Sequence, residues 1–134
     1  MANEILFDTF PTVLGNAKIT PSQFAILVLE MIRTEGLAEL LDKFRDHGFD
    51  DAARTWVGSG KNLSLSAQDV ERVLGPASIQ ALAREANIAP KAAATEVASL
   101  LPQLVDKLTP AGHLPDKPTL DKYFDLLRQK IGML

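Results

Sequence analysis

The chain has 134 residues, no cysteine and a net charge of −3, and 46% of its side chains are hydrophobic. This length predicts one domain, with enough buried apolar surface to fold without disulfides or a structural metal. The lack of cysteine excludes disulfides, cysteine zinc sites and thiol nucleophiles. The slightly acidic charge balance argues against a dedicated binder of nucleic acid or anionic membranes.

Residues 1–19 are predicted to form an irregular arm whose apolar side chains pack back on the core, and residues 20–134 a single helical domain. The longest apolar run covers residues 24–29 and resumes for only two residues after Glu30. A membrane span needs about 20 such residues. The N-terminal residues also lack the basic region of a signal peptide. We therefore expect a cytoplasmic protein with no membrane span.

Short helices with clear boundaries are predicted along the rest of the chain. Thr20 and Pro21 are typical of a helix start, and Gly36 is typical of the end of the same helix. Apolar residues surround this helix between residues 24 and 32, which predicts that it lies at the centre of a bundle. Further helices are predicted over residues 37–47, 49–57, 66–74, 76–86, 91–108 and 116–131.

Pro102 lies inside the longest of these predicted helices. A proline within a helix removes one backbone hydrogen bond and clashes with the preceding turn, so we expect a kink or restart near Leu100–Leu101. No stretch of the chain alternates between apolar and polar residues as a strand does. The predicted fold class is therefore all-α, a multihelical bundle of about six or seven short helices.

Residues 76–101 have the pattern of a helix-turn-helix, with a tight turn at Asn87 and an apolar residue, Ile88, after it. A DNA reader of this kind needs basic and amide side chains on the first turns of its second helix. Here those turns offer Lys91 and then three alanines, which suit close helix packing better. A weak DNA-binding or regulatory role that uses Lys91 is therefore an alternative, and nucleic acid is not the expected partner.

The sequence contains no recognisable catalytic or metal-binding motif. The segment 58–61 (Gly-Ser-Gly-Lys) lacks both the earlier glycine and the following Ser or Thr of a phosphate-binding loop. His47 and His113 have no second ligand at the spacing of a metal site. We expect no catalytic residue, metal or cofactor. A small-ligand binder or enzyme with a pocket between helices is a further alternative.

The expected function is that of a non-enzymatic protein-interaction module with an unidentified protein partner. The only tryptophan, Trp56, precedes a glycine-containing loop, and a second loop over residues 109–115 is stiffened by prolines, which lowers the entropy lost on binding. The indole either packs on the core with its N–H bonded to a loop carbonyl or anchors a partner. The candidate surface contains Trp56, Gly58, Lys61, Asn62, Pro110 and His113.

Several motifs lie in the same order as in a known bacterial family. Trp56 is followed by a loop with Gly and Asn, then by a Ser-x-Gln helix start at Ser66 and the ending Val73-Leu74-Gly75. The Leu-Pro-Gln-Leu-Val-Asp segment 101–106 and the Thr-Pro-Ala-Gly segment 109–112 continue the pattern. Over roughly residues 20–115 the chain resembles the YidB-like family. The resemblance implies an all-α bundle with a homeodomain-like element, and it supplies no established activity and no catalytic residues.

Overall fold

The computed structural model describes residues 19–58 and 61–133, and every regular element in these ranges is a helix. The predicted arm lies outside the described residues, apart from Ile19. The all-α fold class is confirmed, and the predicted helix ends are correct to within one or two residues. The helices are α2 (Pro21–Glu35), α3 (Leu37–Asp46), α4 (Asp50–Val57), α5 (Ala67–Leu74), α6 (Pro76–Ala86), α7 (Pro90–Leu108) and α8 (Lys117–Gly132).

Local chemistry at the helix ends explains why the chain divides in this way. The backbone N–H of Gln23 donates to Thr20 Oγ1 at 3.1 Å, and the N–H of Thr20 donates to Gln23 Oε1 at 2.8 Å, which together form a capping box at the start of α2. Gly36 alone separates α2 from α3, and Gly75 alone separates α5 from α6. Both have φ near +90°, a conformation that side chains with a Cβ rarely adopt, so the two sharp corners require glycine.

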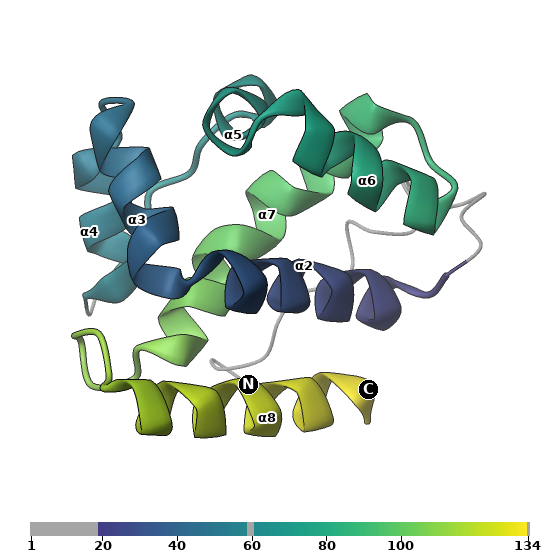
Figure 1. Ribbon diagram of the computed structural model, residues 1–134. Helices are drawn as coiled ribbons and strands as arrows, with labels where there is room; N and C mark the ends of the chain where they lie inside the picture. The colour runs from purple at the N-terminus through teal and green to yellow at the C-terminus, as the bar shows by residue number, and fades with distance from the viewer. Residues whose placement is uncertain (1–18, 59–60, 134) are drawn as a thin grey trace.

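The central helix of the bundle is α7, and the prediction that the segment 24–32 would be central is wrong. Figure 1 shows α7 crossing the molecule between α5 and α6 on one side and α8 on the other, and α7 also packs against α2 and α4. On α2, the side chains of Leu27 and Met31 remain partly exposed. Helical periodicity shows on which sides of a helix the apolar residues lie, but it does not show which of those sides a neighbouring helix will cover.

Pro102 does not interrupt α7. The helix continues from Pro90 to Leu108, so the restart predicted near Leu100–Leu101 is absent. Pro102 has no N–H to donate to the preceding turn, which weakens the helix locally. The side chains of Leu100, Leu101 and Leu104 around it are completely buried, and this burial outweighs the lost hydrogen bond.

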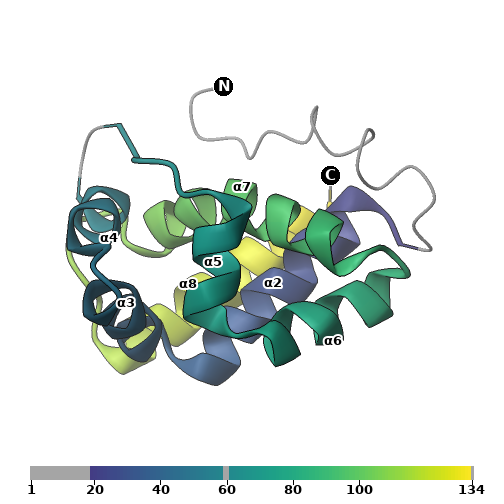
Figure 2. The same ribbon diagram turned by 90° about the horizontal axis from the view of Figure 1, so that it is seen from above.

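The helix pair α6 and α7 has the predicted helix-turn-helix geometry. Asn87 ends α6 in the left-handed conformation, with φ 58° and ψ 48°, and the N–H of Ile88 donates to the carbonyl of Ala83 at 3.0 Å. Ala93 and Ala94, on the first turns of α7, are buried, as expected for close packing. In Figure 2 the α3–α4 pair lies at one end of the molecule and α6 at the other. None of the helices in ranges 19–58 and 61–133 is long and apolar enough to cross a membrane.

Candidate interaction groove

Trp56 is part of the core, and it holds the loop that follows α4. Its side chain is completely buried and meets the ring of Phe44 edge to face, with 5.1 Å between the ring centroids. Its indole Nε1–H donates to the carbonyl of Leu63 at 2.8 Å. Of the two readings of Trp56, the core reading is correct, and its expected place on the interaction surface is wrong because a partner cannot reach a buried indole.

Two further hydrogen bonds fix the same loop. The N–H of Leu63 donates to Thr55 Oγ1 at 3.0 Å, and the Thr55 hydroxyl donates to the carbonyl of Ala52 at 2.7 Å. Asn62 Nδ2 donates to the carbonyl of Pro102 at 3.3 Å, across 40 positions of sequence. The loop is therefore attached both to α4 and to the middle of α7.

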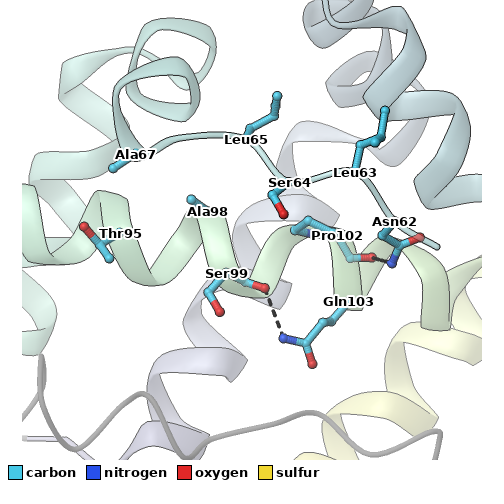
Figure 3. A pocket seen from close by; sticks show the side chains of 10 residues that line it. All are labelled: Asn62, Leu63, Ser64, Leu65, Ala67, Thr95, Ala98, Ser99, Pro102 and Gln103. Carbon is cyan, nitrogen blue, oxygen red and sulfur yellow. Dashed lines mark hydrogen bonds between the residues drawn. The ribbon is translucent and has the colours of Figure 1, made fainter.

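A groove of about 430 Å³ lies between this loop and the outer face of α7 (Figure 3). We call it the loop–α7 groove. None of its lining side chains is ionisable, and the mixture of apolar side chains, hydroxyls and amides suits an uncharged ligand. It is lined by Asn62, Leu63, Ser64, Leu65, Ala67, Thr95, Ala98, Ser99, Pro102 and Gln103.

Figure 3 shows the loop in an extended conformation whose side chains alternate. Asn62 and Ser64 point toward α7, whereas Leu63 and Leu65 point away from it. The hydroxyl groups of Ser64 and Ser99 have no hydrogen-bond partner within the described chain. Leu63 is 48% exposed and provides an apolar contact at the rim of the groove. The groove therefore offers two free hydroxyls and an apolar rim.

The backbone of the loop also has a free edge. In an extended segment, the N–H and C=O of one residue point to one edge and those of its neighbours point to the other. Both backbone groups of Leu63 are directed at α4, where Thr55 and Trp56 bind them. The N–H and C=O groups of Asn62 and Ser64 therefore face the opposite edge, and they make no backbone hydrogen bond in the described part of the chain.

Comparison with known proteins places the chain in a family. A family model described as YidB-like protein matches residues 12–117, which is most of the chain and includes the whole loop–α7 groove. The chain belongs to the YidB-like family. One family relative, the uncharacterized protein YidB of Escherichia coli, is 26% identical over 87 residues, which cover 64% of this chain and 66% of that protein.

The YidB-like fold also has a counterpart among solved structures. A homeodomain-like protein of unknown function from Shigella flexneri superimposes with a TM-score of 0.68 and 24% identity, covering 94% of this chain and 99% of that one. The likeness supports the homeodomain-like architecture that the resemblance implied. It carries no activity over to this family member, because the neighbour's own function is unknown.

Most of the residues predicted to form the interaction surface lie outside this groove. Among the six, only Asn62 lines it. Gly58 ends α4 through its N–H, which donates to the carbonyl of Arg54, and Lys61 is exposed beside the loop. Pro110 and His113 are exposed in the other loop and do not line the groove.

The groove residues on α7 are absent from the surface predicted from the sequence. Thr95 and Ser99 are four residues apart and face solvent on one side of the helix, so helical periodicity alone marks this side as the outer face. Nothing in the sequence indicates that the extended loop lies beside it. That arrangement arises from the Asn62 contact with Pro102.

Glu96 is a buried acidic residue on α7 that does not line the groove. Its side chain is 1% exposed, and Oε2 has no hydrogen-bond partner in the described residues. Burial raises the pKa of Glu96 to about 7, because a low-dielectric environment disfavours the charged carboxylate. Within the described ranges, no group of three His, Asp or Glu side chains is placed to hold a metal ion, so Glu96 belongs to no such cluster.

Proposed function

We propose that this chain is a non-enzymatic protein-interaction module, and that the loop–α7 groove binds an extended, uncharged segment of a partner protein. The observation that carries the proposal is the free backbone edge at Asn62 and Ser64, held rigidly beside an uncharged groove. A peptide that pairs with such an edge gains main-chain hydrogen bonds, and its alternate side chains enter the groove.

The hydrogen bonds that attach the loop support this role. Binding to an ordered edge avoids much of the entropy that is lost when a mobile loop becomes fixed. The hydrogen bonds from Trp56 and Asn62 already hold the loop in its extended form. The free hydroxyls of Ser64 and Ser99 suit partner side chains that are small and polar, such as Ser, Thr or Asn.

The DNA-binding alternative has less support from the side chains. Lys91 is exposed at the start of α7, but the next three residues are alanines, two of them buried. Arg84 is the nearest cation on α6, beside the exposed carboxylate of Glu85. A binding isotherm with duplex DNA that weakens steeply between low and moderate salt would favour this alternative over the proposal.

The proposal is tested by selecting peptides from a displayed random library on the full chain and measuring their affinity by calorimetry. The selected peptides should be uncharged over about five residues. Replacing single peptide N–H groups with N-methyl groups should weaken binding at alternate positions, because only alternate groups face the free edge. Weakening at none of the positions would overturn the edge-pairing mechanism.

A matched pair of variants locates the site. Ser99→Arg places a long charged side chain in the groove, and we expect affinity to fall at least about ten-fold. Gln129→Arg makes a similar change on the exposed face of α8 and should leave affinity within about two-fold. Equal losses in both variants would show that the peptides bind through general electrostatics rather than in the groove.

A further inference from the structure

Several apolar side chains of α2 pack at the edge of the core and remain partly exposed. Phe24, Val28 and Ile32 are completely buried, whereas Leu27 and Met31 are only partly covered. Leu27 and Met31 lie four residues apart and therefore on the same side of the helix. Leu27 and Met31 thus form a short apolar stripe at the edge of the core, while Ile26, also partly exposed, lies on another side of the helix.

This stripe forms one wall of a second groove, of about 350 Å³, and α6 forms the other wall. We call it the α2–α6 groove. On each helix the lining residues are spaced three or four apart, so the groove follows about two helical turns, roughly 10 Å. Its lining consists of Leu27, Glu30, Met31, Thr34 and Glu35 from α2, and Ser78, Ala81, Leu82 and Glu85 from α6.

The charged side chains of this groove are all acidic. Glu30, Glu35 and Glu85 line it, and no basic side chain does. Arg128 pairs with Glu30 at 3.2 Å, and Lys43 pairs with Glu35, each reaching from a helix outside the groove. All four of these side chains are partly exposed, so each pair contributes little stability and can exchange for another cation.

Glu85 is the exposed carboxylate of the α6 wall. It makes no ion pair within the described ranges. An apolar floor with an acidic rim is complementary to a surface that presents an apolar stripe between cations.

We propose that the α2–α6 groove is a docking surface for a basic amphipathic helix of a partner protein. Both walls are helices whose backbone groups are already bonded internally, so this groove has no free strand edge for an extended peptide. A helix satisfies its own backbone and brings apolar side chains at positions i, i+3, i+4 and i+7 to the floor. Lysine or arginine beside that stripe would lie against the glutamates.

This surface is independent of the loop–α7 groove, because the two share no lining residue. Failure of one proposal therefore leaves the other intact.

The test uses the full chain with ¹³C-labelled methionine methyl groups. The probe is a synthetic helical peptide with leucine at i, i+3, i+4 and i+7 and lysine at its other positions. The Met31 methyl resonance should shift during titration, whereas that of Met133, 81% exposed at the end of α8, should not. The same peptide with glutamate in place of lysine should leave Met31 unchanged.

Two charge-reversal variants then test the rim. Glu85→Lys should weaken binding of the lysine peptide by about ten-fold, since it replaces an attraction with a repulsion. Asp46→Lys makes the same change of net charge at an exposed position outside the groove, and we expect an effect within about two-fold. The proposal would be overturned if the Met31 methyl resonance did not shift or if the glutamate peptide bound equally well. An equal loss of affinity in the two variants would also overturn it.

Discussion

The two loops that the sequence marks as one candidate surface differ in how they are attached. The loop after α4 is held by side-chain hydrogen bonds from Trp56, Thr55 and Asn62, which fix an extended backbone beside α7. The loop after α7 is attached at its start, where the Thr109 hydroxyl lies near the carbonyls of Val57 at 3.4 Å and Val105 at 2.9 Å.

Beyond Thr109 the second loop is exposed. Residues 110–114 face solvent, and the ring nitrogen Nδ1 of His113 lies 3.2 Å from the carbonyl of the neighbouring Leu114. Prolines and a histidine therefore mark an exposed loop, whereas side-chain hydrogen bonds to α4 and α7 hold the other loop in an extended form.

Replacing Trp56 with Ala should have the largest effect. It removes a completely buried indole from the core together with the donor to Leu63, so the free energy of unfolding should fall by about 3–5 kcal/mol. Chemical denaturation followed by far-UV circular dichroism measures this loss. A loss below about 1 kcal/mol would contradict the core role of Trp56.

Raising the pH should lower the free energy of unfolding, because the buried carboxyl of Glu96 lies on α7, to which both loops are attached. The pKa of Glu96 is about 7 in the folded chain and about 4.5 when unfolded, so the folded state holds more protons between these values. The free energy of unfolding should therefore decrease from pH 5 to pH 7.5, by about 2 kcal/mol.

The Glu96→Gln variant provides the control for this pH dependence. It keeps the size of the side chain and removes the titrating group, so its stability should change much less over the same range. Parallel curves for the variant and the original chain would show that Glu96 does not titrate with a raised pKa.

Trp56→Phe should act on the first loop more than on the second. Phenylalanine retains an aromatic ring but cannot donate to the Leu63 carbonyl, which costs about 1–3 kcal/mol and releases the loop. Amide hydrogen exchange should accelerate at Leu63, whose N–H donates to Thr55, and stay unchanged at Gly112, whose N–H donates to the carbonyl of Thr109. Equal acceleration in both loops would contradict the difference in attachment.

Pro110→Ala and His113→Ala should have the smallest effects. Both side chains are exposed and make no contact with the loop–α7 groove, so stability should change by less than about 0.5 kcal/mol. Affinity for the selected peptides should stay within about two-fold. A ten-fold loss of affinity in either variant would show that the second loop is part of the binding surface.

Capping residues and glycines made the helix boundaries predictable. Thr20, Gly36, Ser66 and Gly75 act through bonds and backbone angles within a few residues, which the sequence contains directly. For the same reason, Asn87 was correctly placed at the turn between α6 and α7.

The candidate site was predicted only in part, because it depends on contacts between distant segments. Asn62 was identified from its loop, but its contact with Pro102 spans 40 positions, and no local pattern shows it. Glu96 is buried although it is acidic and lies at the edge of the apolar stripe of α7, at the boundary with solvent. Neighbouring structure, rather than local sequence, decides burial at such a boundary.

The central claim is that the free edge at Asn62 and Ser64 binds an extended peptide. Its most direct test is to follow the backbone amide resonances of the full chain while a selected uncharged peptide is added. The amides of Asn62 and Ser64 should move downfield and become protected from exchange, while those of His113 and Leu114 stay in place. Binding that leaves Asn62 and Ser64 unprotected, or that shifts residues 110–114 instead, would contradict the claim.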